Sequence, residues 1–566
     1  MSDLVIGTRR AATVRPWRAG AIALAILITA TVVAWFIYRK SVTYDMPNVV
    51  VEGGLGNDQR TGELAALRFG TSTLQYRGGI AVLRTNGEPH QMGAAHGRLL
   101  AGELRHFVDA TKPSIARIVD GNGMFASLLH GIVLDWRLRF LDDGLSDADR
   151  RWLAGMVRGA ASSGSPVSYP ELVHAAATID VGAPSQRSAE ADVHVLARSI
   201  SFAVPLGNDP SRIWLASQLA LPGLDDGGDS LPTLVTIARP TGKLAWAGVG
   251  WPAMAGVLLG VNAAGIAIAV HPVRSGDVRA TRAAQPTSML ARSVLEQAHT
   301  IDEALAVITK GEALGAAAFV VIDGNEGRSV VIERTPDKTA VNRQPASVIG
   351  DILENQAFAT DPQNDRARRQ LASTMRVHRA TRLVKTPPAD LGALAGILRD
   401  HHTDDDVLRP LGHRGTIADV AAVSTVIIDA RARMVWIADP TAAGRMRGFD
   451  LRQDLGIDIG ASANGIADLA TDPEAESGAR ARIIAARHAL RQARFALVRR
   501  TPTVASDYVA RALALAPDLP ECLEWAAIVA AANSDATTAR AFAQRWIDTG
   551  ADNPAGEERA RAILAR

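Results

Sequence analysis

The sequence has little of several features that mark large classes of proteins. Among its 566 residues the only cysteine is Cys522, which excludes an internal disulfide framework and a cysteine-rich metal site. The formal net charge is only +2, because 61 Lys and Arg residues balance 59 Asp and Glu residues. Such a balance gives no electrostatic footprint for nucleic acid, so we expect no nucleic-acid partner. We also find no phosphate-binding loop and no zinc-ligand spacing, and therefore predict no cofactor and no metal.

A long uncharged segment lies near the N-terminus. Residues 19–38 read AGAIALAILITATVVAWFIY, and a helix of this length crosses the ~30 Å hydrocarbon layer of a bilayer. Four arginines precede it and only Arg39 and Lys40 follow, which favours a cytoplasmic N-terminus over residues 1–18. A cleaved signal peptide is the alternative, but the run is long and no small-x-small cleavage site follows it. We therefore predict a single-pass membrane protein with its main domain on the extracytoplasmic (periplasmic or extracellular) side.

Strand-like and helical patterns alternate in blocks along the middle of the chain. Four strand-like segments follow one another between residues 233 and 272 with short Gly, Asn and Pro punctuation, which indicates an antiparallel meander. Thr300, followed three residues later by Glu303, forms a capping-box pattern that predicts a helix start. The segments AAFVVID and SVVIER flank GNEGR and predict a hairpin. Sheets covered by helices in layers are the expected architecture.

Composition shifts divide the chain further. We predict a tether over 39–76, a main domain over 77–455, a linker over 456–477 and a helical region over 478–566. The helical region has a tetratricopeptide-like pattern, but at most two units fit, and three are normally needed for a free-standing array. Two interpretations stay open for it: an appendage packed on the main domain, or a module that binds a protein partner.

Several motifs occur in a fixed order between residues 78 and 452. The segment at 246–272 reads WAGVGWPAMAGVLLGVNAAGIAIAVHP, and STVIIDARARMVWIADP closes the series. The series opens with the element Gly87-x-Pro89-x-x-x-Gly93-x-x-His96-Gly97. In this order the motifs resemble the isopenicillin-N acyltransferase-like (acyl-CoA:6-aminopenicillanic acid acyltransferase) family of N-terminal-nucleophile (Ntn) hydrolases. The resemblance implies an α+β fold, the αββα sandwich of two antiparallel sheets between helical layers.

The same resemblance points to a nucleophile. Members of the family cut their own chain before a cysteine, whose thiol attacks an amide or acyl substrate while its own α-amine takes the proton. The family pattern resembles Gly-Cys-Thr/Ser-Ser/Thr-Phe, and here the matching residues are Arg198-Ser199-Ile200-Ser201-Phe202. Ser199 would attack the carbonyl of Arg198, and hydrolysis of the resulting ester would free Ser199 as a new N-terminus. A hydroxyl depends more than a thiol on base assistance and on an oxyanion hole.

The positions that support the nucleophile in the family have changed here. The family segment resembles Gly-Arg-Asn-Leu-Asp-Trp, whereas this chain reads ASQLALP. Ser217 replaces the Arg, Gln218 the Asn, and Ala220 the Asp that would orient the α-ammonium group. Asp419 lies near the place of a second, later Arg, and Arg414 a few residues away is a substitute for it.

Two asparagines are candidates for oxyanion stabilisation. The segment DILENQAFATD resembles the family segment that carries such a residue, here Asn355, and a side-chain amide in this role supplies about 2.7–4 kcal/mol. Asn262 lies in GVNAAG, where an asparagine in a tight strand connection is the alternative interpretation. We expect a structural role for His96, and for DHHTDDD at 400–406 a solvated acidic loop rather than a metal site.

Two functions from different classes remain open. The first is a membrane-anchored Ntn-type amidohydrolase or acyltransferase that acts on a small C–N amide or acyl thioester substrate, with Ser199, Asn355 and Asn262 as catalytic residues and 19–38 in the lipid bilayer. The second is a catalytically degenerate Ntn-fold protein that serves as a binding or scaffolding module and contacts a protein partner through its helical tail. The domain-wide resemblance favours the first, and the substitutions around Ser199 favour the second.

Overall fold

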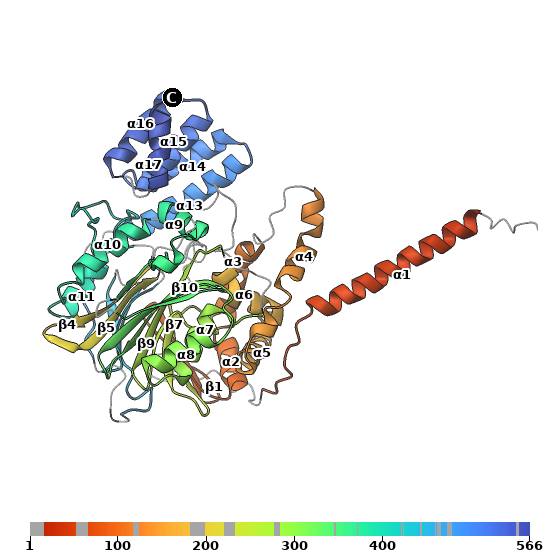
Figure 1. Cartoon of the computed structure of the whole chain (residues 1–566), viewed down its shortest axis with the longest axis horizontal. Coiled ribbons are helices and arrows are strands. Elements are labelled where there is room, and N and C mark those ends of the chain that lie inside the picture. The colour runs from red at the N-terminus through yellow and green to blue at the C-terminus, as the bar shows by residue number, and fades with distance from the viewer. Residues whose placement is uncertain are drawn as a thin grey trace, which may run out of the picture.

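Two β-sheets lie face to face at the centre of the molecule, and helices cover their outer faces (Figure 1). The computed structural model describes residues 16–51, 66–116, 124–181, 199–219, 233–276, 283–343, 347–370, 372–419, 422, 424–441, 444–458, 460, 466–472, 478–550 and 554–565. This α+β arrangement is the predicted sandwich of two sheets between helical layers.

The first sheet has ten strands, and its centre is the predicted meander. β6, β7, β8 and β9 pair antiparallel in chain order, which confirms the prediction for residues 233–272. β10 and β11 form the predicted hairpin next to β9. The pair β3–β6 is parallel, unlike its neighbours. The strands in sheet order are β1 (Leu67–Phe69), β2 (Ser72–Arg77), β3 (Ile80–Gly87), β6 (Thr233–Pro240), β7 (Trp246–Gly250), β8 (Leu259–Asn262), β9 (Ile266–Val273), β10 (Ala316–Asp323), β11 (Arg328–Arg334) and β12 (Thr339–Asn342).

The second sheet has six strands, and its two faces bury different side chains. Ala203 and Leu215 point toward the first sheet and share its core. Phe202 and Trp214, one position away, pack instead against helices α10 (Ser373–Leu383) and α11 (Leu391–Leu398). The strands in sheet order are β13 (Ser347–Ile349), β4 (Ile200–Leu206), β5 (Asp209–Leu219), β14 (Ser424–Asp429), β15 (Met434–Ala438) and β16 (Met446–Asp450).

Helices α7 (Thr287–Gln297) and α8 (Ile301–Lys310) lie over the outer face of the first sheet (Figure 1). The hydroxyl of Thr300 accepts a hydrogen bond from the backbone N–H of Glu303 at 3.2 Å. The predicted helix start at Thr300 is thereby confirmed.

Helices α2 (Pro89–Leu99) and α5 (Asp147–Ser162) pack with their backbones in close approach. A Cβ on Gly93 or Gly97 would lie about 2 Å from a carbonyl oxygen of α5, at 2.0 and 2.1 Å. Gly155 and Gly159 meet α2 in the same way, at 2.2 and 2.1 Å. The glycines of the opening motif are therefore a packing requirement, because any larger residue would separate the two helices.

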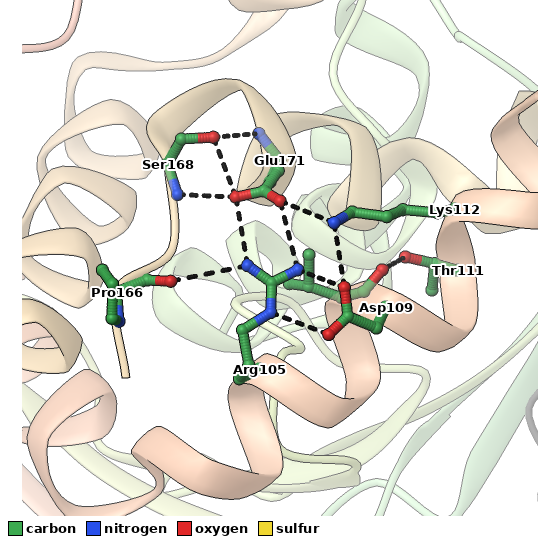
Figure 2. A network of polar contacts seen from close by, with 8 residues as sticks. Arg105, Asp109, Thr111, Lys112, Pro166, Ser168 and Glu171 are labelled. Atoms are coloured by element: carbon green, nitrogen blue, oxygen red, sulfur yellow. Dashed lines mark hydrogen bonds and ion pairs between the residues drawn. The ribbon is translucent and has the colours of Figure 1, made fainter. Parts of the chain in front are cut away.

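Helices α3 (Ala101–Ala116) and α6 (Tyr169–Val181) are joined by a charge network near the surface (Figure 2). Arg105 donates to Asp109 at 2.5 Å and to Glu171 at 3.1 Å, and Lys112 pairs with the same two carboxylates at 2.9 Å. Burial raises the pKa of Glu171, but Arg105, the Ser168 backbone N–H and Lys112 together lower it to about 2. Two cations and two anions cancel, so the network joins two helices and carries no net charge for a ligand.

The C-terminal region consists of helices that each pack on the next, and it lies at one end of the sandwich (Figure 1). Its helices are α13 (Ala479–Val498), α14 (Pro502–Leu515), α15 (Pro520–Ala532), α16 (Ala536–Asp548) and α17 (Pro554–Leu564). In the segment predicted as a linker, the described residues Ile466 and Leu469 pack against the outer core of the second sheet. That part of the segment is therefore attached to the main domain.

The N-terminal helix α1 (Pro16–Val42) extends away from the rest of the chain (Figure 1). Within the part of the chain that the structure describes, one segment, Gly20–Val42, is long and apolar enough to cross a membrane. Helix α4 (Met124–Leu138) lies beside its end, where the Tyr38 hydroxyl is 3.3 Å from the Ile132 carbonyl and 3.3 Å from the Asp135 carboxylate.

Candidate active site around Ser199

Ser199 lies immediately before β4 and is fully buried. Its backbone N–H donates to Oδ1 of Asp351 at 3.2 Å. The sheet register explains this contact: β13 runs antiparallel to β4 with Ile349 opposite Ser201, so two residues further on Asp351 lies opposite Ser199. The atom that would become the α-amine of a freed Ser199 therefore already faces a carboxylate.

Asp351 is held by a set of buried groups. Its second oxygen pairs with Arg376 at 3.0 Å, and its own backbone N–H donates to the Ser373 hydroxyl at 3.0 Å. Burial raises the pKa of Asp351 to about 7, while the Arg376 guanidinium and hydrogen bonds from Ser199 act to lower it. The carboxyl group therefore changes its charge near neutral pH. Asp351 thus places a carboxyl group at the Ser199 nitrogen. Ala220, which the resemblance matched to the family's Asp, lies outside the described residues.

A polar row continues from Ser199 between the two sheets. Ser201 and Ser217 are direct partners in the β4–β5 register, and their hydroxyl oxygens are 2.7 Å apart. Nε2 of His271, on β9 of the facing sheet, is 2.8 Å from the Ser201 hydroxyl. Burial lowers the pKa of His271 to about 3, so the imidazole is neutral at physiological pH. Ser217, which the resemblance matched to an Arg, is thus linked through Ser201 to the facing sheet.

Gln218 and Asp419, two other substituted positions, contact each other. The backbone N–H of Asp419 donates to the Gln218 side-chain oxygen at 2.9 Å, and the Gln218 amide donates to the Thr425 hydroxyl at 3.3 Å. The Asp419 carboxylate pairs with Arg487 of α13 at 3.3 Å. The guanidinium of Arg414, which we considered a substitute for the later Arg, pairs with Glu524 of α15 at 2.9 Å. These positions connect the second sheet to the C-terminal helices.

Asn355 lies four residues after Asp351 on the same segment. Its side-chain oxygen accepts from the Ala357 backbone N–H at 3.0 Å and caps the short helix η3 (Gln356–Phe358). Within the described part of the chain its amide nitrogen has no hydrogen-bond partner, so its donor end is available. Glu333 of β11 accepts the backbone N–H groups of Glu354 and Asn355, both at 2.7 Å, and so fixes the position of this turn.

Asn262 is fully buried at the end of β8 and its amide is fully used inside the chain. The two N–H groups donate to the carbonyls of Leu295 at 3.0 Å and Ala298 at 2.8 Å, and the oxygen accepts from the Ile266 backbone N–H at 2.9 Å. These bonds join the β8–β9 turn to the end of α7. Of the two asparagines, only Asn355 therefore keeps a free donor for an oxyanion.

His96 and the acidic loop have structural contacts. Nε2 of His96 is 2.5 Å from the Pro252 carbonyl, and burial lowers the pKa of this histidine to about 4. In the loop, Asp400 contacts Arg379 at 2.6 Å and His402 at 2.8 Å. Further pairs of the same loop engage Arg382 and Arg409.

Three residues of this site escaped the sequence reasoning: Asp351, Arg376 and His271. Asp351 stands in the quoted segment DILENQAFATD, but it is 152 residues from Ser199. Only the pairing of β13 with β4 brings the two together, and β13 has just three residues. Only a prediction that residues 347–349 form a strand beside β4 could have placed Asp351 at Ser199.

Two facing sheets between helical layers are the architecture that the resemblance to Ntn hydrolases implied. Comparison with known families finds one match: residues 231–439 are similar to the family described as acyl-coenzyme A:6-aminopenicillanic acid acyl-transferase. The match includes Asn262 and Asn355, and Ser199 lies outside it.

Among solved structures, a Caenorhabditis elegans N-acylethanolamine-hydrolyzing acid amidase ortholog is 16% identical, with 41% of this chain and 93% of that chain covered and a TM-score of 0.30. A mutant of the conjugated bile acid hydrolase from Clostridium perfringens is 9% identical, with 48% and 96% covered and a TM-score of 0.27. Another variant of the same hydrolase is 11% identical, with 47% and 95% covered and a TM-score of 0.25. No curated protein matches the chain.

Proposed function

We propose that this protein is a membrane-anchored amidohydrolase or acyltransferase of the Ntn class that frees Ser199 as its own N-terminal nucleophile. The observation that carries the proposal is the 3.2 Å hydrogen bond from the Ser199 backbone nitrogen to Asp351. A carboxylate at this nitrogen orients the α-amine that an Ntn enzyme uses as its base. Asp351 thus orients the α-amine, the role that the family assigns to the Asp replaced here by Ala220.

Activation needs water as its only co-reactant. The Ser199 hydroxyl attacks the carbonyl carbon of Arg198, the C–N bond between the two residues breaks, and the proton goes to the departing nitrogen. Water then hydrolyses the ester, which restores the hydroxyl and leaves a carboxylate on Arg198. In the intact chain Ser199 has no exposed surface, so the proposal requires that cleavage before Ser199 also opens the site to a substrate.

In turnover, the freed Ser199 attacks the carbonyl of a small amide or acyl thioester, and its α-amine accepts the hydroxyl proton. Asn355 donates its amide N–H to the oxyanion, and Glu333 holds the turn that carries Asn355. The acyl group then passes to water in a hydrolase or to an amine in an acyltransferase.

The test is the fate of the full-length chain. We expect purified protein to contain a fragment whose N-terminal sequence begins at Ser199, and Ser199→Ala to abolish it. Processed protein should release aminocoumarin from N-acyl aminocoumarins of graded chain length, and the Ser199→Ala variant should not. Ser201→Ala is the control, since it removes a neighbouring hydroxyl on the same strand and should leave a fragment starting at Ser199.

A catalytically degenerate binding module is the second candidate. Ser217 and Gln218, at positions where the family has Arg and Asn, are engaged in structural hydrogen bonds. An intact wild-type chain that unfolds cooperatively yet hydrolyses no acyl substrate would exclude the first function and leave this one.

Membrane attachment through α1 is part of the proposal, with the N-terminus in the cytoplasm. In support, the apolar side chains of Gly20–Val42 are exposed along the helix. The neighbouring helix α4 exposes Ile132, Val133 and Trp136, the last with 45% of its surface accessible. An apolar patch next to the base of an anchor is where a domain resting on a bilayer would contact lipid.

A further inference from the structure

The loop 409–416 is held by the C-terminal helices along most of its length. Arg409 donates to the Thr549 carbonyl at 3.0 Å, and Nε2 of His413 is 3.1 Å from the Gly550 carbonyl. Arg487 of α13 donates to the Gly412 carbonyl at 3.2 Å. Leu411 packs against the hydrophobic core of α13, α14 and α15. By its contacts the loop belongs as much to the C-terminal helices as to the sandwich.

Buried ion pairs fix the same loop. Arg414 and Glu524 are 2.9 Å apart, and only 6% and 0% of their side chains are accessible. A second cation, Arg559, contacts Glu524 at 2.8 Å. Arg487 joins Glu521 at 2.9 Å to Asp419 at 3.3 Å. Removing one partner of a buried pair leaves an uncompensated charge, so these contacts define one geometry of the loop.

The loop also reaches the surroundings of Ser199 by two connections. The Arg414 carbonyl accepts from Nη1 of Arg376 at 2.6 Å, and Nη2 of the same guanidinium pairs with Asp351. In the second connection, the Asp419 backbone N–H donates to Gln218, whose partner in the β4–β5 register is Ile200, the residue after Ser199.

We propose that the C-terminal helices are a structural component of the Ser199 site, in which Glu524 is a positioning residue that holds Arg376 against Asp351 through the backbone of Arg414. This inference rests on the proposed function. In this arrangement α15 stabilises the positions of Arg376 and Asp351 through Glu524. A ligand or partner that shifts α15 would slow the chemistry at Ser199 without touching it.

The test measures self-cleavage of the full-length chain before Ser199 against pH, in wild type and in Glu524→Gln. We expect cleavage to slow by about 2- to 30-fold, the range of coupling between linked sites. We also expect the pH midpoint of cleavage to move upward, because a looser Arg376 stabilises the Asp351 carboxylate less. Among the described residues, the other groups that face Asp351 are Ser199, Ser373 and His271, the last through its contact with Gly350.

Glu557→Gln is the matched control, because among the described residues Glu557 pairs only with Arg561, on the exposed side of α17. It should leave both rate and midpoint unchanged. Leu523→Ala removes a buried side chain of the C-terminal core and should lower the melting temperature without moving the midpoint. If Glu524→Gln loses cooperative unfolding, Glu524→Asp, which keeps the charge on a shorter side chain, should show the same upward shift.

The outcomes separate the two proposals. A wild-type chain that is never cleaved overturns the proposed function, and this inference with it. A wild-type chain that is cleaved, with Glu524 variants equal to it in rate and midpoint, overturns only the supporting role of the C-terminal helices. A loss of rate with an unmoved midpoint also contradicts the inference, because it indicates general destabilisation.

Discussion

At the scale of single residues, the nucleophile candidate acquires its partner from a distant part of the chain. Asp351 contacts the Ser199 nitrogen, and Arg376 keeps the buried carboxylate from being isolated. An isolated buried carboxylate would be protonated at neutral pH. With Arg376 beside it, its pKa stays at about 7, where a modest change of pH switches the charge.

The first residue-scale prediction concerns Asp351→Asn. We expect self-cleavage to slow by about 10- to 100-fold, since a hydrogen bond to a charged group contributes about 1.5–3 kcal/mol. Wild-type cleavage should rise with pH around a midpoint near 7 as Asp351 ionises, and the variant should lack this rise. Timed electrophoresis across pH 5–9 measures both.

The raised pKa of Asp351 also makes the stability of the protein depend on pH. The folded pKa of this carboxyl group lies above the unfolded value of about 3.9, so the folded state binds this proton more tightly. Its contribution to the unfolding free energy therefore falls as pH rises from about 4 to about 7. Asp390→Asn is a control, because this exposed residue caps α11 and Asn caps equally well. Equal pH profiles for wild type and Asp351→Asn would contradict the assignment.

A second prediction separates the two asparagines. Asn355→Ala should lower kcat by about 10²–10³, the usual loss of an oxyanion donor, with little change in melting temperature. Asn262→Ala should instead destabilise the fold by about 1–3 kcal/mol, because three buried backbone groups lose their partner. Steady-state kinetics and thermal unfolding of both variants distinguish the catalytic role from the structural one. Full activity in Asn355→Ala would show that Asn355 is not the oxyanion donor.

At the scale of elements, helix packing explains the glycines of the motif at residues 87–97. Gly93 and Gly97 on α2 interlock with Gly155 and Gly159 on α5, so two short glycine patterns about sixty residues apart describe a single contact. The sequence showed only one of the two patterns as a motif. The second becomes meaningful once the helices are seen side by side.

The prediction at this scale is that Gly97→Ala destabilises the protein. Its Cβ would lie 2.1 Å from the Met156 carbonyl oxygen, and overpacking of this kind costs about 1–3 kcal/mol. Gly102→Ala on α3 is the matched control, since nothing lies within 4 Å of its Cβ and alanine favours the helix. Thermal melts should show a lower transition for the first and an equal or higher one for the second. The reverse order would contradict this packing.

At the scale of the whole molecule, the protein combines an apolar N-terminal helix, a two-sheet sandwich and a C-terminal helical region. Because the net charge of the whole chain is only +2, we expect the charges beside α1 to set the orientation of the protein in a membrane. We expect protease added to the outer face of spheroplasts to degrade the main domain. Lysis with detergent should expose the first residues to the same protease. Full protection of the domain before lysis would reverse the proposed orientation.

The sequence by itself determined the features that depend on neighbours along the chain. The meander over 233–272, the hairpin of β10 and β11 and the cap at Thr300 follow from local alternation, turn residues and side-chain reach. The family match over 231–439 belongs with them, because an ordered series of local motifs carried it. The expectations drawn from cysteine and charge needed only a count.

The tertiary structure alone decided what surrounds Ser199. A three-residue edge strand brings Asp351 opposite Ser199, which is 152 residues away in the sequence. The loop 409–416, bound by α13 and α15, places the Arg414 carbonyl within hydrogen-bond distance of Arg376. Neither arrangement has a local pattern, because strand register and buried ion pairs are set by elements that meet only after folding. The substitutions near Ser199 suggested a degraded site, and the fold supplies a carboxylate from the other side of the strand.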